Sequence, residues 1–278
     1  MTQPQPVNPQ AAQARAKIEN MKRTWEQKRA IADSLSRIKH KIGVYSGKGG
    51  VGKTTVAVNL AVTIAQGGSS VGILDVDIDC PNVVRAIKIS EPPEVDDNKR
   101  LVPPERFGVR VMSMGFFQKK EEEAIIWRGP MIHNAINQLL QSTEWGSLDY
   151  MIIDLPPGTS DSPLTVMQAL TLDGFVVVTT PQELAKIDAM RSINMIRTLH
   201  VNVLGVVENF SGEVFGTGAG EELAREADIP FLGRLELRSD YRDTSRPTVL
   251  NSNAVLAEYQ YIAERLQRSL QEQSTDVT

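Results

Sequence analysis

The sequence is poor in cysteine and in long apolar runs. Cys80 is the single cysteine among 278 residues, so no disulfide can form within the chain, as expected in a reducing cytosol. No apolar run reaches the roughly 18 residues needed to cross a bilayer. The first ten residues, MTQPQPVNPQ, lack the basic and apolar regions of a secretory signal. We therefore expect a cytoplasmic protein without a membrane-spanning segment.

An excess of basic charge is also missing. The chain carries 34 acidic and 30 basic residues, a formal charge of −4, whereas nucleic-acid-binding surfaces are usually basic. The C-terminal segment has apolar residues at three- and four-residue steps, surrounded by charges of both signs. This pattern is typical of a helix packed on a core, not of a basic membrane anchor. Its apolar residues are Val255, Tyr259, Ile262, Leu266 and Leu270. We expect neither a nucleic-acid partner nor a membrane partner.

Composition changes along the chain indicate its organisation. We expect four parts: a disordered tail over residues 1–14, a charged helix over 15–38, a single P-loop domain over 39–272 and a C-terminal tail over 273–278. The charged helix has sparse apolar contacts at Ile18, Met21, Trp25 and Ile31. This pattern fits a solvated helix packed lightly on the domain, and it also fits a docking arm for a partner.

Short runs rich in Val and Ile alternate with longer amphipathic segments in the rest of the chain. The expected strands are 41–46, 70–77, 109–114, 149–154, 174–180, 202–209 and 229–235. The expected helices are 53–66, 130–142, 162–170, 183–198, 219–227 and 253–271. Most of these strands are apolar on both faces, as in a parallel sheet that helices cover on each side. We therefore predict an α/β fold with a doubly wound, mostly parallel sheet and helices on both faces.

The segment GKGGVGKT has the spacing G-x-x-x-x-G-K-[ST] of a phosphate-binding loop, between an apolar strand and a helix. Its glycines let backbone N–H groups approach phosphate oxygens. Lys53 is expected to reach the β- and γ-phosphates, and the Thr54 hydroxyl to ligate Mg²⁺. The residues expected to bind ATP here are Gly47, Lys48, Gly49, Gly50, Val51, Gly52, Lys53, Thr54 and Thr55.

Acidic residues follow two of the expected strands. VGILDVD ends in Asp75 and Asp77, and DYMIIDLPPG carries Asp154 and Gly158. A lone aspartate at a strand end usually caps a helix, but two such strands beside a phosphate loop favour catalysis. We expect Asp154 to hold Mg²⁺ through water. Gly158 is expected to offer its N–H to the γ-phosphate, as nucleotide switches do.

The variant KGGVGKT resembles the deviant Walker A loop of the MinD, ParA and nitrogenase iron protein class. The runs WRGPM (127–131), DYMIIDLPPGTSDSPLTVMQ, VVVTTPQELAKIDAMRSINM and VLGVVENFSG resemble the Mrp (ApbC-type) iron–sulfur carrier ATPases. The resemblance spans about residues 36–248. It implies an ATPase in which Lys48 crosses to the nucleotide of the partner subunit in a homodimer.

The resemblance also assigns roles to individual residues. It implies that Asp77 orients the attacking water, so that the catalytic residues are Lys48, Lys53 and Asp77. It further implies that Asn209 hydrogen-bonds the adenine base, and that the segment after IPFLGRLEL lines the base pocket.

The chain departs from this family at the cluster site. Carriers of this type usually place a CxxC pair between two motifs that here run together as VVENFSGEVFGTGAGEE. Two copies of Cys80 would supply two thiolates, fewer than the four that a standard cluster takes. A bound iron–sulfur cluster is therefore in doubt, and we interpret Cys80 as a small, semi-buried residue beside a nucleotide-sensing switch. The histidines, His40, His133 and His200, show no ligand spacing and are expected at the surface or in packing.

Three functions fit these observations. The leading one is a slow, dimer-dependent ATPase that serves unidentified client proteins in iron–sulfur or related metalloprotein maturation. A MinD/ParA-like positioning switch is the second, although the basic tail or patch that would bind membrane or DNA is missing. The third is a non-catalytic ATP-binding module. It would be expected to lack a catalytic group, yet Lys48, Lys53, Thr54, Asp77 and Asp154 are all present.

Overall fold

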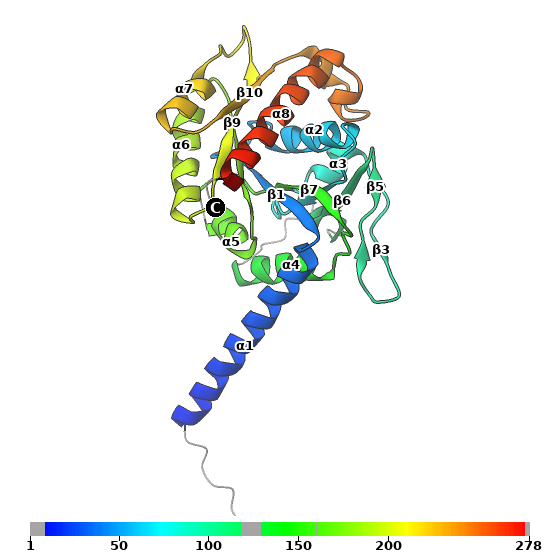
Figure 1. Ribbon diagram of the computed structural model, residues 1–278, viewed down its shortest axis with the longest axis vertical. Helices are drawn as coiled ribbons and strands as arrows, with labels where there is room; N and C mark the ends of the chain where they lie inside the picture. Colours follow the sequence, from blue (N-terminus) through cyan, green and yellow to red (C-terminus); the bar gives the residue numbers. More distant parts are fainter. Residues whose placement is uncertain (1–8, 118–128, 160, 276–278) are drawn as a thin grey trace, which may run out of the picture.

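A computed structural model of the chain describes residues 9–117, 129–159 and 161–275 (Figure 1). Its centre is an eight-stranded sheet with the order β10-β9-β8-β1-β7-β2-β6-β5. All neighbouring strands are parallel except β5, which runs antiparallel to β6. The strands of this sheet are β1 (Ile38–Tyr45), β2 (Val71–Asp75), β5 (Glu105–Arg106), β6 (Val109–Ser113), β7 (Leu148–Asp154), β8 (Gly174–Thr179), β9 (Val203–Ser211) and β10 (Phe231–Glu236). A separate antiparallel pair is formed by β3 (Glu94–Val95) and β4 (Leu101–Val102).

Helices cover both faces of the sheet, which confirms the predicted doubly wound α/β fold. One face is covered by α2 (Lys53–Gln66), α3 (Val83–Ile87) and α8 (Asn253–Thr275). The other is covered by the end of α1 (Pro9–Leu35), α4 (Gly129–Ser142), α5 (Asp161–Ala169), α6 (Glu183–Thr198) and α7 (Ala219–Glu226). The described ranges also contain three short 3₁₀ turns: Met114–Phe117, Ser239–Arg242 and Thr248–Leu250.

Strand β8 shows why the apolar runs form a sheet that is buried on both sides. Phe175 and Val177 point into the core under α6, and Val176 and Val178 point into the core under α2 and α8. All four side chains are at most 1% exposed. Both faces of the strand thus stabilise the fold by removing apolar surface from water.

The seven expected strands are all present, and the helices 53–66 and 183–198 have the expected bounds. The five apolar residues expected on one side of the last helix are buried in the core, as predicted. The short elements α3, β3, β4 and β5 were not expected. They are two to five residues long, too short to show a helical or strand period.

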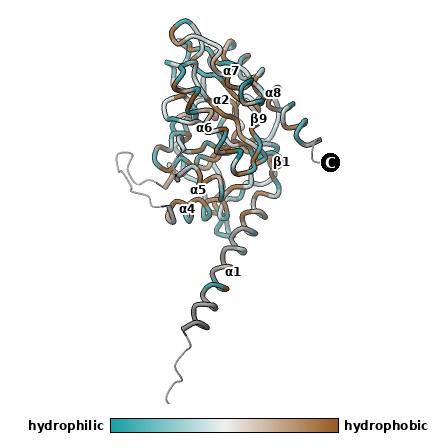
Figure 2. The backbone as a smooth tube through the Cα atoms, turned by 90° about the vertical axis from the view of Figure 1, so that its left-hand side faces the viewer, coloured by the Kyte–Doolittle hydropathy of each residue, from teal (hydrophilic) through white to brown (hydrophobic). Residues whose placement is uncertain are grey.

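Helix α1 differs most from its expectation. It begins at Pro9, within the stretch expected to be a disordered tail. Only its C-terminal end packs on the domain, through Ile31 and Leu35, and the rest projects away from the body (Figures 1 and 2). The expected contacts of Ile18, Met21 and Trp25 are wrong, because these side chains are exposed.

No helix in the described residues is long and apolar enough to cross a membrane.

Candidate nucleotide site

The phosphate loop joins the end of β1 to the first turn of α2. Gly50 and Gly52 adopt φ values of 80° and 83°, the left-handed region that glycine tolerates best. A Cβ atom at Gly52 would lie 2.2 Å from Nδ2 of Asn209, and one at Gly47 would lie 2.2 Å from the Asp188 carbonyl oxygen. Side chains are thus excluded from both ends of the loop. The N-terminus of α2 opens directly onto it, which favours binding of an anion.

Lys53, Thr54 and Asp154 form a tight group behind the loop. Lys53 Nζ lies 2.6 Å from Oδ1 of Asp154, and the Thr54 hydroxyl donates to Oδ2 of the same carboxylate at 2.6 Å. The Asp154 side chain is fully buried and the Lys53 side chain is 6% exposed. The hydroxyl and the carboxylate are hard oxygen donors of the kind Mg²⁺ prefers. This donor set therefore fits a magnesium ion.

Asp77 is a second carboxylate near the Lys53 ammonium group. Its Oδ2 is 3.7 Å from Lys53 Nζ, and its Oδ1 accepts a hydrogen bond from the backbone N–H of Cys80. Burial raises the pKa of the Asp77 carboxyl, while the charge of Lys53 opposes this shift. The sequence placed Lys53, Asp77 and Asp154 on separate elements, and the sheet brings them together.

Asp75 links the ends of three elements. Its carboxylate accepts hydrogen bonds from the N–H groups of Asp77 and Val83 and from the Ser113 hydroxyl, at 3.1, 3.1 and 2.9 Å. Burial, followed by the nearby charge of Asp154, raises the pKa of Asp75 to about 8. Sequence reasoning noted Asp75 only as a strand end. The contact to Val83 explains α3, because it satisfies an N–H group in the first turn of that helix.

Lys48 stands apart from this carboxylate group. It is partly exposed, and its carbonyl oxygen accepts a hydrogen bond from the Ser46 hydroxyl at 3.0 Å. Its ammonium group forms no ion pair with the described residues. Lys48 lines a cavity of about 320 Å³ together with Phe215 and Leu237, both of which are partly exposed. The two lysines of the loop thus occupy different sides of it.

Gly158 lies beside the start of the phosphate loop. Its N–H donates to the Ser46 carbonyl at 2.9 Å, and its own carbonyl accepts a hydrogen bond from the Tyr45 hydroxyl. The expected contact of this N–H with a γ-phosphate therefore requires exchange of one hydrogen bond. Its φ of 92° is a conformation that other residues adopt only with strain.

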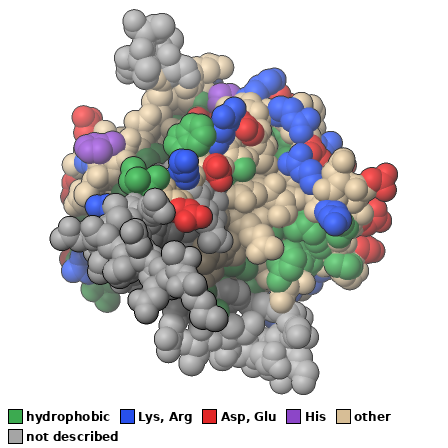
Figure 3. Space-filling model, turned by 90° about the horizontal axis from the view of Figure 1, so that it is seen from below, with side chains coloured by type: hydrophobic (Ala, Val, Ile, Leu, Met, Phe, Trp, Pro, Cys, Tyr) green, Lys and Arg blue, Asp and Glu red, His purple; other side chains and the backbone are tan. Residues whose placement is uncertain are grey.

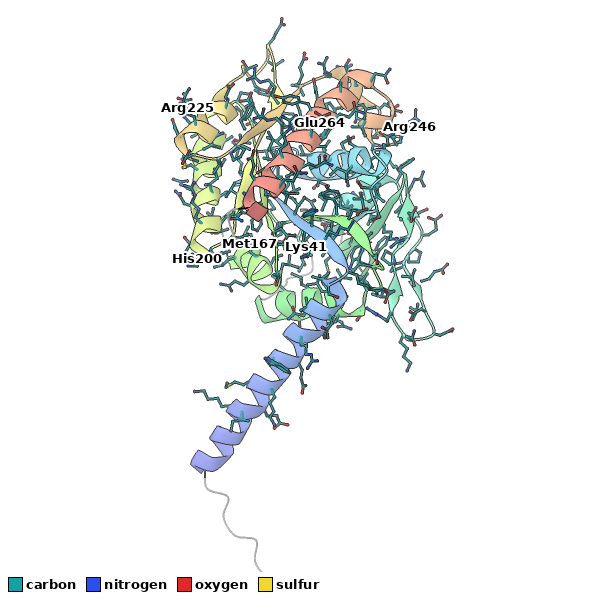
Figure 4. All side chains as sticks on the ribbon, viewed as in Figure 1. Lys41, Met167, His200, Arg225, Arg246 and Glu264 are labelled. Atoms are coloured by element: carbon teal, nitrogen blue, oxygen red, sulfur yellow. The ribbon has the colours of Figure 1, made fainter. Side chains whose placement is uncertain are left out.

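Asn209 and the segment after β10 line one cavity, of about 180 Å³. The side chain of Asn209 is buried and donates to the Val51 carbonyl at 2.8 Å, which ties β9 to the phosphate loop. Thr55 reaches the same cavity from α2. Arg246 lines it as well and lies at the end of the molecule opposite α1 (Figure 4). The structure thus brings together the residues that the resemblance assigned to a base pocket.

Glu208 is a buried residue that sequence reasoning missed. Its carboxylate accepts hydrogen bonds from the Ser211 hydroxyl at 2.6 Å and from the N–H groups of Gly218 and Gly220. It therefore holds the start of α7 against the end of β9. The available signal was a charged residue inside an apolar strand, shortly before a glycine-rich turn.

Cys80 corrects one expectation, because it is exposed and not semi-buried. It sits in the turn before α3 and lines an open, polar cavity with Asp79, Asn82 and Arg85.

His40 stacks on Tyr150 with ring centres 5.2 Å apart, and His200 is exposed after α6 (Figure 4). Within the part of the chain that the structure describes, no three His, Cys, Asp or Glu residues group to hold a metal ion. Trp127 and the side chain of His133 lie outside that part.

Comparisons with known proteins match most of the chain. A family model described as ParA, NUBPL iron-transfer P-loop NTPase, matches residues 37–267. The iron-sulfur cluster carrier protein of Methanocaldococcus jannaschii is 38% identical over 256 residues, which cover 87% of this chain and 88% of the relative. That of Pyrococcus horikoshii is 41% identical over 268 residues, covering 87% and 90%.

Solved structures of other proteins share the fold. A nucleotide-binding protein from Archaeoglobus fulgidus, in complex with ADP, is 37% identical with a TM-score of 0.70, over 80% of this chain and 91% of that one. The cell division ATPase MinD of Pyrococcus furiosus shares the fold at 20% identity, with a TM-score of 0.67 over 82% and 98%.

Proposed function

Because the chain belongs to the family of NUBPL iron-transfer P-loop NTPases, we propose that it is a dimeric ATPase whose nucleotide cycle serves iron–sulfur cluster assembly or carriage. The observation that carries the proposal is that Lys53 and Thr54 both bond to Asp154, while Asp77 lies 3.7 Å from the same ammonium group. This is the set of side chains that hydrolysis of a nucleoside triphosphate requires.

In the proposed reaction, Lys53 leaves Asp154 and binds oxygens of the β- and γ-phosphates. Mg²⁺ would be held by the Thr54 hydroxyl and, through water, by Asp154, and would supply positive charge to the phosphates. Asp77 accepts a hydrogen bond from the attacking water. The water oxygen bonds to the γ-phosphorus as the bond to the bridging oxygen breaks, giving ADP and phosphate. The water protons pass to the phosphate or to solvent.

Lys48 completes the proposed site from the second subunit. It is partly exposed and lines a cavity, and no described residue neutralises its charge by an ion pair. A cation that arrives from a partner stabilises the charge on the transferring phosphoryl group, as an arginine finger does. Hydrolysis would then depend on dimerisation, and turnover per chain should rise with protein concentration.

Phosphate release by mixed variants tests this proposal. We expect Lys48→Ala to lower turnover about a thousandfold, by analogy with loss of an arginine finger. Asp77→Asn is also expected to be slow. When the two variants are mixed, a mixed dimer contains one site with an intact Asp77 and a Lys48 from its partner. Turnover should therefore partly recover. If Lys48 acted in its own subunit, mixing would restore nothing.

Binding of an iron–sulfur cluster is a separate question from ATP hydrolysis. The chain has one cysteine, so a dimer offers the two Cys80 thiolates, where a standard cluster takes four. We therefore propose that the chain acts on a cluster together with a client protein, which supplies the further ligands that the cluster needs. Anaerobic reconstitution of the purified dimer with iron and sulfide tests this assignment. We expect no stable absorbance of an iron–sulfur cluster, and a stable cluster retained by Cys80→Ser would contradict it.

A further inference from the structure

The projecting part of α1 carries a narrow apolar seam, which we define as Ile18, Met21 and Trp25. Their side chains are 56%, 65% and 62% exposed. Their spacing of three and four residues places them on one side of the helix, as at the a and d positions of a coiled coil. Ile31 and Leu35, at 7% and 4% exposed, instead anchor the helix to the domain. Large apolar side chains grouped on an exposed surface indicate an interaction site.

Basic residues border the seam. Lys22 lies four residues after Ile18, and Arg29 lies four residues after Trp25, so each is a neighbour of its apolar residue on the helix. The Arg29 guanidinium lies 5.5 Å from the centre of the Trp25 ring. Lys17 precedes Met21 by four residues, and all three basic residues are exposed. The helix as a whole has six basic and three acidic residues, although the chain has a charge of −4.

This charge pattern disfavours pairing of the seam with a second copy of itself. With Ile18 at position a, Lys22 and Arg29 both occupy position e, and Lys17 occupies position g. A parallel pair would place Lys17 opposite Lys22 of the other copy, and an antiparallel pair would bring the e positions together. Either arrangement opposes like charges, whereas acidic residues on a partner would complement them.

A membrane surface also fits the seam poorly. Helices that lie in a membrane interface present a broad apolar face. Here the exposed seam offers one large apolar side chain per turn, and the exposed side chains of Glu19 and Glu26 lie on a neighbouring face. Seen from the α1 end, the described surface likewise mixes apolar, basic and acidic side chains (Figure 3). A narrow seam with charged borders matches a helical groove better than a lipid surface.

We propose that α1 is a docking arm whose seam binds an apolar groove, rimmed by Asp or Glu, on a different protein. The arm and the phosphate loop lie at opposite ends of β1, since this strand begins after α1 and ends at the loop (Figure 1). The arm therefore shares no residue with the nucleotide site. The inference rests on the arm alone and does not require ATP hydrolysis.

A pair of synthetic helical peptides tests the arm on the full-length chain. The first has Leu at its a and d positions and Glu at e and g, and the second has Lys in place of Glu. We expect fluorescence anisotropy to show binding of the Glu peptide only. Trp25→Ser should weaken it about tenfold, as expected for loss of a buried aromatic anchor. Lys22→Glu combined with Arg29→Glu should reverse the preference to the Lys peptide.

Two measurements control for the fold of these variants. Val95→Ser removes an apolar side chain that is 64% exposed on β3, far in sequence from the seam, and should leave binding unchanged. Each variant should also keep wild-type binding of a fluorescent ATP analogue, because none of these residues lines the nucleotide site.

Four outcomes would overturn the proposal. The first is absence of binding to the Glu peptide, and the second is equal binding of both peptides. The third is self-association in analytical ultracentrifugation that Trp25→Ser abolishes, which would assign the seam to a second copy. The fourth is co-sedimentation with phosphatidylglycerol vesicles that Trp25→Ser abolishes, which would assign it to a membrane.

Discussion

The two ends of β1 show opposite ways of using charged and apolar side chains. At the phosphate loop, Lys53 and Asp154 are almost fully buried and bonded to each other. At the α1 end, Met21 and Trp25 are more than half exposed. Catalysis on a phosphate requires charged groups that are positioned before the substrate binds. A recognition surface, by contrast, can stay exposed until its partner binds. Substitutions at the first end should therefore lower stability and activity strongly. Substitutions at the second end should leave the stability of the chain without a partner nearly unchanged.

Asp154→Ala should give the largest effect. It removes the closest carboxylate from a buried lysine and leaves that lysine with Asp77 at 3.7 Å. Breaking a buried ion pair on one side costs about 3–5 kcal/mol in the free energy of unfolding. We expect a loss of this size in urea unfolding, together with loss of ATP turnover.

An exposed ion pair provides the control for this prediction. Lys39 pairs with Asp149, but the Lys39 side chain is 71% exposed. Lys39→Ala should leave the unfolding transition close to that of the wild type, because water screens such pairs. Similar losses in both variants would remove the contrast between the two environments.

Asp77→Asn should have the next largest effect, on turnover and not on binding. The amide keeps the shape of the side chain but loses the charge that would orient the attacking water. We expect phosphate release to fall about a hundredfold or more, the lower end of what a positioned catalytic side chain contributes. The affinity for a non-hydrolysable ATP analogue should change little.

Cys80→Ser is the matched control for Asp77. Cys80 contacts Asp77 through its backbone N–H, which serine retains, and its side chain is exposed. Turnover should stay near that of the wild type. A strong loss would show that the Cys80 thiol itself takes part in the reaction.

The sequence predicts elements that depend on local patterns better than side-chain positions that depend on contacts with other elements. The strands and the phosphate loop repeat local patterns, so apolar runs and glycine spacing were enough to find them. The position of Asp75 depends on a partner distant in sequence, because its carboxylate accepts a hydrogen bond from Ser113, 38 residues further along the chain. No local pattern around Asp75 indicates that contact, whereas Glu208 carried a local signal as a charged residue in an apolar strand, shortly before a glycine-rich turn. The exposure of Cys80 was also missed, because the turn before α3 is fixed by a hydrogen bond that the Val83 N–H donates to the Asp75 carboxylate.

At α1 the local pattern was less informative. Sparse apolar residues at helical spacing cannot show which of them meet the domain. Ile18 and Ile31 have the same chemistry, yet one is 56% exposed and the other 7%. Only the direction in which the helix leaves the domain separates the two.

Asp75→Asn should have a smaller effect that depends on pH. The pKa of Asp75 is raised from 3.8 to about 8 in the folded chain, chiefly by burial. Between these values the folded state binds more protons than the unfolded state, so stability falls as pH rises. One such group contributes a slope of at most about 1.4 kcal/mol per pH unit. Asp75→Asn should flatten urea-unfolding stability measured between pH 5 and pH 8. An unchanged slope would place the titration on another group.

Trp25→Ala should have the smallest effect and tests the α1 end directly. An exposed side chain contributes little to the folded state, so we expect the free energy of unfolding to stay within about 0.5 kcal/mol of the wild type. Leu35→Ala, on the same helix but 4% exposed, should cost about 2–5 kcal/mol. Thermal unfolding of both variants measures the difference. A loss for Trp25→Ala comparable to that for Leu35→Ala would mean that the seam packs on the domain, and the arm would then have no free surface to offer a partner.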